Sequence, residues 1–122
     1  MELTLQSNKS GIFIKNYENR KLYIGDDIFT NNVIVTSTKV YDWTTINQNH
    51  IANFDSFKIV LDLNPELIVY GTGPNIILPD NKIIKRINSL AIGFDFMTTE
   101  SACKTFNLLM SENRNVAAAI IL

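Results

Sequence analysis

Residues 67–73 read Leu-Ile-Val-Tyr-Gly-Thr-Gly, and this stretch decides the fold class. Residues 67–70 show no alternation of apolar and polar side chains, which is typical of a strand covered on both faces. Pro65 separates this strand from the segment before it, because the residue that precedes a proline avoids helical backbone angles. The Gly71-Thr72-Gly73 that follows predicts a tight turn. A doubly covered strand of this kind indicates a layered α/β domain.

Helices and strands alternate on both sides of this strand, and residues 93–97 and 116–121 are further predicted strands. Each predicted helix has a candidate N-cap: Asp55 or Ser56 for the first, Asp80 for the second, and Thr98 or Thr99 for the third. Each also has an apolar face that we expect to be buried: Phe57, Val60 and Leu61 in the first, Ile83, Ile84, Ile87, Leu90 and Ala91 in the second, and Ala102, Cys103, Phe106, Leu109 and Met110 in the third.

Before residue 44 the pattern is different, because short strands are separated by turn-forming residues. The predicted strands cover residues 3–6, 11–17, 21–25, 32–36 and 39–43, and we expect them to form antiparallel sheet. Strands followed by alternating helices and strands predict one α/β domain over residues 1–122. It should have three layers, with a mixed central sheet, flanking helices and an additional antiparallel β layer from the N-terminal half.

The composition argues against several classes of protein. The 11 Lys and Arg residues are balanced by 12 Asp and Glu, so a formal net charge of −1 supplies no field that would attract nucleic acid. The longest apolar run, residues 116–122, is far shorter than the roughly 20 residues of a membrane-spanning helix. Residues 1–10 resemble neither a secretory signal nor a transit peptide. A single cysteine forms no internal disulfide, so a reducing cytoplasm is the expected compartment.

The Gly71-Thr72-Gly73 turn is the first candidate site, because the ends of buried strands in open α/β sheets often bind ligands. Its backbone amides are able to receive an anion. Ile76 stands where a dinucleotide-binding fingerprint needs its third glycine, so we expect no such cofactor. Asn107 borders an apolar helix face and needs backbone partners, for which the glycine turn is a candidate. Two interpretations stay open: a structural turn, or a small-ligand crevice formed by Gly71, Thr72, Gly73 and Asn107.

We find no catalytic or metal-binding pattern in the sequence. Cys103 lies within an apolar helix face, which favours a packed side chain over a nucleophile. His50 lies in a polar segment without a serine or metal-binding partner, so we interpret it as a surface residue. Glu112 and Arg114 flank a turn and predict a local ion pair. The remaining candidates are interaction surfaces: a basic ridge of Lys82, Lys85 and Arg86 suited to an acidic partner, and an exposed Leu108 suited to a contact in a homo-oligomer.

A series of motifs runs through the C-terminal half. It comprises the strand ending in Gly71-Thr72-Gly73, the helix entry Met97-Thr98-Thr99, the helix segment Ala102-Cys103-Lys104-Thr105-Phe106-Asn107 and the closing Glu112-Asn113-Arg114-Asn115-Val116-Ala117-Ala118-Ala119. On these residues the chain resembles the small domain family that includes the mitochondrial NADH dehydrogenase (complex I) assembly factor 3 and many bacterial proteins. Asn113 stands where many relatives have glycine, and asparagine tolerates the left-handed backbone of such a turn. Pro74 stands close to where relatives often place an arginine, which speaks against an anion site here.

The resemblance implies a mixed sheet with helices packed on it and an additional β layer. It implies no reaction, catalytic residue or cofactor, because the mitochondrial relative is a non-catalytic helper in building a membrane complex. We therefore expect a cytoplasmic bacterial protein, a helper rather than an enzyme, with an unidentified protein partner and respiratory-complex subunits as candidates. The alternative hypothesis is a small-ligand-binding protein or enzyme that uses the crevice at the Gly71-Thr72-Gly73 turn.

Overall fold

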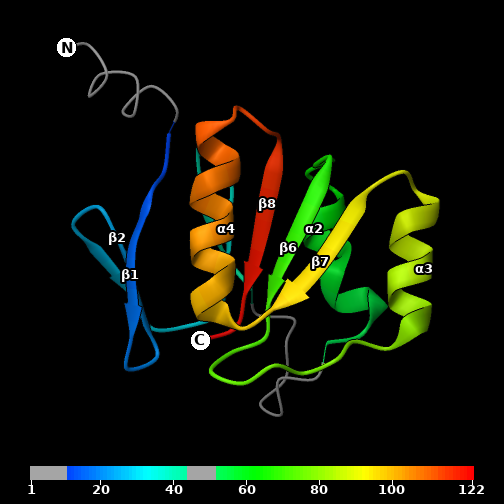
Figure 1. Cartoon of the computed structure of the whole chain (residues 1–122), viewed down its shortest axis with the longest axis horizontal. Coiled ribbons are helices and arrows are strands. Elements are labelled where there is room, and N and C mark those ends of the chain that lie inside the picture. Colours follow the sequence, from blue (N-terminus) through cyan, green and yellow to red (C-terminus); the bar gives the residue numbers. More distant parts are fainter. Residues whose placement is uncertain (1–10, 44–51) are drawn as a thin grey trace.

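In the computed structural model, residues 11–43 and 52–122 are described, and they form two β-sheets with helices packed between and beside them (Figure 1). The larger sheet has five strands in the order β5-β4-β8-β6-β7, and the smaller has three in the order β1-β2-β3. The α/β class, the mixed central sheet and the additional antiparallel layer predicted from the sequence are confirmed. The predicted strand at residues 3–6 lies outside the described residues.

The five-stranded sheet is parallel at one side and antiparallel at the other. β6 pairs in parallel with both β7 and β8, whereas β4 pairs antiparallel with β8 and β5. Every residue of β8 is buried, because helices cover both faces of this central strand. The strands are β4 (Val33–Val35), β5 (Val40–Asp42), β6 (Leu67–Gly71), β7 (Gly93–Met97) and β8 (Val116–Ile120).

The three-stranded sheet consists of β1 (Ile14–Glu18), β2 (Lys21–Ile24) and β3 (Asp27–Phe29), joined as antiparallel neighbours. β3 was not predicted, because a strand of three residues is too short to show a periodic pattern. The segments predicted at residues 32–36 and 39–43 are strands, but β4 and β5 extend the larger sheet instead of joining the smaller one. The N-terminal half therefore contributes to both sheets.

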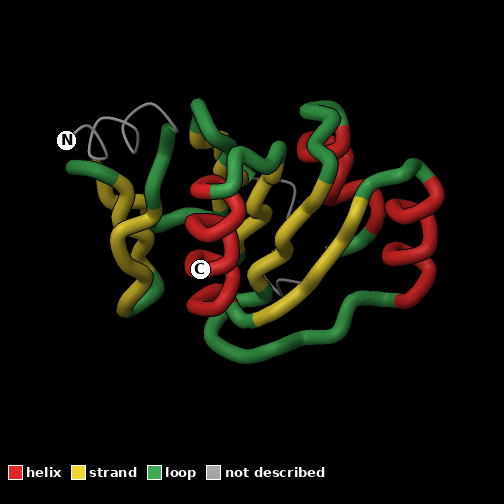
Figure 2. The backbone as a smooth tube through the Cα atoms, turned by 45° about the horizontal axis from the view of Figure 1, so that its top comes forward, coloured by secondary structure: helices red, strands yellow, loops and turns green. Residues whose placement is uncertain are grey.

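The helices lie on both faces of the larger sheet. α4 (Thr99–Ser111) lies between the two sheets, as Figure 2 shows, and it packs on β6, β8 and β1. The opposite face carries the 3₁₀ helix η1 (Phe54–Phe57), α2 (Lys58–Leu61) and α3 (Asn81–Ser89). Two apolar cores result, one around α4 and one beneath α2 and α3.

The helix ends agree with the sequence only in part. Asp80 and Thr98 are the N-caps of α3 and α4, as predicted. Asn53 is the N-cap of the first helical segment, so the prediction of Asp55 or Ser56 was wrong. The Asn53 side chain accepts a hydrogen bond from the Ser56 amide, and the Ser56 side chain accepts one from the Asn53 amide. α3 ends at Ser89 because the chain turns there through a positive φ of 64° at Ala91, and Leu90 is 54% exposed instead of buried.

Candidate functional site

The Gly71-Thr72-Gly73 turn lies where β6 ends, next to the start of α4. The Thr72 amide donates to the Met97 carbonyl oxygen over 2.8 Å. The Thr72 hydroxyl donates to the Asn75 carbonyl oxygen over 2.7 Å and accepts from the Ile77 amide over 3.2 Å. Thr72 is 2% exposed. Its polar groups are therefore used to fold the loop that follows the strand.

Thr99, at the first position of α4, binds the same turn from the other side. Its buried hydroxyl accepts from the Gly73 amide over 2.8 Å and donates to the Ile121 carbonyl oxygen over 2.5 Å. Its own amide donates to the Gly73 carbonyl oxygen over 2.9 Å. A single side chain thus joins the turn after β6, the start of α4 and the residue after β8. Sequence reasoning considered Thr99 only as an N-cap, because its partners are distant in the sequence.

The two glycines serve different geometric needs. A Cβ atom at Gly71 would lie 2.9 Å from the Thr99 hydroxyl and 3.1 Å from Ala102 Cβ, so α4 approaches the strand too closely for a side chain. Gly73 has a φ of +102°, a backbone conformation that other residues rarely adopt. The amides of Thr72 and Gly73 are both bonded internally, so the structural interpretation of this turn accounts for all that we observe. The ligand-binding interpretation stays a prediction.

Asn107 is half-buried and bonds to backbone, as expected, but its partner is β1 and not the glycine turn. Its side-chain oxygen accepts from the Ile14 amide over 2.9 Å, and its side-chain nitrogen donates to the Ile14 carbonyl oxygen over 2.8 Å. The side chain pairs with the edge of β1 much as a neighbouring strand would. It is two turns along α4 from Thr99, and no contact with the Gly71-Thr72-Gly73 turn is seen among the described residues.

The other residues considered for chemistry contribute no catalytic arrangement within the described part of the chain. Burial raises the pKa of the Cys103 thiol to about 12, and the nearby Glu100 carboxylate acts in the same direction. His50 lies outside the described residues. Residues 11–43 and 52–122 contain no cluster of His, Cys, Asp and Glu that could hold a metal ion. A thiol held in its protonated form is a poor nucleophile.

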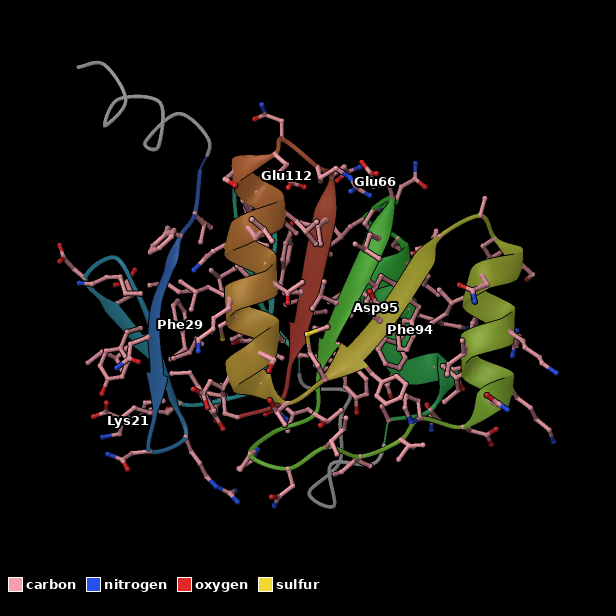
Figure 3. The ribbon with its side chains drawn as sticks, in the orientation of Figure 1. Lys21, Phe29, Glu66, Phe94, Asp95 and Glu112 are labelled. Atoms are coloured by element: carbon pink, nitrogen blue, oxygen red, sulfur yellow. The ribbon has the colours of Figure 1, made fainter. Side chains whose placement is uncertain are left out.

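The predicted ion pair between Glu112 and Arg114 is wrong, because Arg114 reaches across to the start of β6. Its Nε donates to a Glu66 carboxylate oxygen over 2.9 Å. The Asn115 amide donates to the other oxygen. Both hydrogen bonds lower the pKa of the Glu66 carboxyl, and the one from Asn115 has the larger effect. Figure 3 shows Glu66 and Glu112 at the same end of the molecule. Asn113 has the left-handed φ of 60° expected of this turn.

Leu108 and the basic ridge of α3 lie on the surface, as predicted from the sequence. Leu108 is 59% exposed, as predicted from its place opposite the inner face of α4. Its role in a subunit contact stays a prediction. Lys82, Lys85 and Arg86 are all exposed on α3, and the Arg86 guanidinium carbon lies 3.7 Å from the centre of the Phe54 ring.

The fold and the Gly71-Thr72-Gly73 turn define a layered α/β domain in which internal hydrogen bonds hold the turn after β6. The residues described at this turn include no catalytic group. The chain belongs to the family described as "Protein of unknown function (DUF498/DUF598)", whose model matches residues 14–121. It is 35% identical over 126 residues to the "13 kDa major membrane protein" of Francisella tularensis subsp. holarctica (strain LVS), covering 98% of this chain and 99% of that protein.

A second relative is the "NADH dehydrogenase [ubiquinone] 1 alpha subcomplex assembly factor 3" of Xenopus tropicalis, which is 30% identical over 112 residues. That match covers 90% of this chain but only 61% of the assembly factor. Among solved structures, a Bordetella parapertussis protein superposes with a TM-score of 0.81 at 21% identity, covering 90% of this chain and 94% of that one. This likeness supports the fold. In the described parts of the chain, no helix has the length and apolar character needed to cross a membrane.

The state of Cys103 gives a direct test of the interpretation that it is a packed residue. At pH 8 a thiol with a pKa near 12 has little thiolate, so we expect native protein to react with 5,5′-dithiobis(2-nitrobenzoic acid) about 100-fold or more slowly than protein unfolded in urea. A Cys103→Ser, Ser101→Cys variant is the control, since Ser101 is exposed on the same helix and its thiol should react rapidly. Equal rates for native wild type and this control would contradict the buried assignment.

Proposed function

We propose that this chain is a non-enzymatic, protein-binding domain that helps to assemble a larger complex. The observation that carries the proposal is an exposed apolar loop, defined here as Ile76, Ile77 and Leu78, between β6 and α3. These residues are 55%, 44% and 76% exposed. Consecutive large aliphatic residues on a surface are unfavourable in water unless a partner covers them. A loop fixed at its base by Thr72 can present such a surface in one conformation.

Charges next to the loop indicate the chemistry of this partner. α3 follows the loop after Pro79 and the single carboxylate of Asp80, and it carries the exposed Lys82 and Lys85, whereas Arg86 lies over the Phe54 ring. Opposite charge across an interface favours encounter and orientation more than affinity. The surface is thus suited to a protein with an apolar patch bordered by acidic side chains.

The names of the assembly-factor relatives support the same class of function. The assembly factors are named for NADH dehydrogenase, so subunits of a respiratory complex are the first partners to test. Because the chain spans 61% of the Xenopus assembly factor, this partner is proposed and not inferred from the match itself. We place the protein in the cytoplasm, since its single cysteine is free and buried, as suits a reducing compartment.

Gentle purification of the tagged protein from its native cells tests the proposal. We expect a defined protein partner to co-purify with wild type. The amount of partner recovered with the Ile76→Asp, Leu78→Asp double variant should be at least about 10-fold lower, because two charges would be buried at the interface. Mass spectrometry identifies the partner, and the quantity recovered gives the loss.

The matched control is Leu90→Asp, Leu108→Asp, which places the same charges at leucines that are 54% and 59% exposed elsewhere. This control should retain the partner. Equal recovery with both double variants would show that the exposed apolar loop is not the binding surface. Recovery of the chain only as a monomer or homo-oligomer would overturn the helper function.

A further inference from the structure

A cleft lies beside the carboxyl end of β6, on the face of the sheet that carries α3, and it shares Ile77 and Leu78 with the exposed apolar loop. It has a volume of about 470 Å³. Its lining is mainly apolar and includes Ile77, Leu78, Pro79 and Ile83, while Asn53, Tyr70 and Asp80 supply its polar groups. Crevices beyond the carboxyl ends of strands in α/β sheets, and apolar clefts with few polar groups, are where small molecules commonly bind.

The Tyr70 hydroxyl is the unusual feature of this cleft. Tyr70 is only 2% exposed, yet its hydroxyl makes no hydrogen bond with any residue in 11–43 or 52–122. Buried hydroxyl groups are nearly always paired, because burial without a partner costs free energy. The hydroxyl is protonated and can donate at neutral pH, and burial raises its pKa further, to about 12. An unpaired donor on a residue that lines a cleft is suited to a ligand acceptor.

The ring of Tyr70 is held in place by other aromatic side chains. Its centre lies 5.2 Å from that of Phe57, 6.0 Å from that of Trp43 and 6.1 Å from that of Phe94, which projects from β7 (Figure 3). Edge-to-face packing against Phe57 and Trp43 fixes the orientation of the ring. The hydroxyl is therefore presented at a fixed position.

The charge of the cleft narrows the class of ligand. The Asp80 carboxylate lies at the rim and already caps α3, where it accepts from the Lys82 amide over 2.9 Å. This carboxylate repels an anionic ligand. It also occupies the Lys82 amide at the N-terminus of α3, where an anion would otherwise bind. We propose that the cleft binds a small neutral molecule with an apolar body and one carbonyl-type acceptor, which receives a hydrogen bond from Tyr70.

Prodan is a suitable probe, because it is a neutral naphthalene dye with a single ketone oxygen. We expect saturable binding to wild-type protein, detected by the emission of the bound dye. Tyr70→Phe should weaken this binding about 3- to 10-fold, which is the effect of one neutral hydrogen bond. It should also shift the emission of the bound dye to shorter wavelength, since the hydrogen bond to the ketone is lost.

Two variants make the test specific. Tyr23→Phe removes a hydroxyl from β2, in the other sheet, and should leave dye affinity unchanged. Ile77→Asp adds a charge at the mouth of the cleft, where the side chain is 44% exposed, and should weaken binding without unfolding the protein. Ile77 also belongs to the exposed apolar loop, whereas Tyr70→Phe leaves that loop unchanged, so the outcome for Tyr70→Phe is separate from that of the proposed assembly surface.

The unfolding free energy of Tyr70→Phe supplies a second readout. Removal of an unpartnered hydroxyl should leave stability unchanged or increase it, because nothing bonded to the oxygen is lost. A clear loss of stability would reveal an internal partner and overturn the assignment. No dye binding to wild type, or equal affinity and emission with Tyr70→Phe, would likewise overturn the proposal.

Discussion

Thr99→Val is expected to destabilise the protein by about 3 kcal/mol, lowering Tm by roughly 10 °C. The substitution keeps the volume of the side chain but removes the hydroxyl that bonds to the Gly73 amide and the Ile121 carbonyl oxygen. Gly73 and Ile121 are both buried, so water could not replace the lost hydrogen bonds to the Gly73 amide and the Ile121 carbonyl oxygen. Chemical denaturation of wild type and variant, analysed with a common slope, measures the difference.

Two further threonine variants separate the hydroxyl from the methyl group. Thr99→Ser keeps both hydrogen bonds and should cost only about 1 kcal/mol for the lost methyl. Thr105→Val makes the same chemical change on the same helix, where the hydroxyl has only a weak contact of 3.4 Å with the Met97 sulfur. It should be nearly neutral. Equal stability of Thr99→Val and Thr105→Val would show that Thr99 does not join the strand ends as described.

Local patterns predicted the elements around β6 well, because each depends on neighbours a few residues away. The unbroken apolar run of β6, the Asp80 cap of α3 and the apolar face of α4 are of this kind. β3 was missed for a related reason, since a strand of three residues shows no periodicity and is defined by its pairing with β2.

The site could not be predicted in the same way. The Thr99 hydroxyl bonds to Ile121, 22 residues away, and the Asn107 amide bonds to Ile14, 93 residues away. Nothing local distinguishes Thr99 from Thr98 as the residue that turns inward. For Asn107 the sequence showed that a half-buried amide needs backbone partners, but not which backbone, because that depends on how α4 is placed against the smaller sheet. The Tyr70 cleft similarly requires the loop to be folded before its walls exist.

Asn107→Leu is expected to cost about 2 kcal/mol and to loosen the smaller sheet. Leucine matches asparagine approximately in volume but offers nothing to the Ile14 amide and carbonyl, and Ile14 is only 3% exposed. β1 is an edge strand of its sheet, so this amide pair ties the sheet to α4 through polar contacts as well as through apolar packing. Hydrogen exchange at the Ile14 amide should become faster. The exchange rates of the amides of β6 and β8 should rise only by the factor that corresponds to the loss of global stability.

Two variants distinguish the hydrogen bonds from other effects of the substitution. Asn88→Leu places the same side chain at an exposed position on α3 and should leave both stability and Ile14 exchange unchanged. Asn107→Asp keeps an acceptor for the Ile14 amide but sets a carboxylate against the Ile14 carbonyl oxygen. That carboxyl should have a raised pKa, because its protonated form alone can donate to the carbonyl. Relative to Asn107→Leu, Asn107→Asp should therefore gain stability as the pH falls towards 4. Parallel pH profiles for the two variants would contradict the two-point pairing with β1.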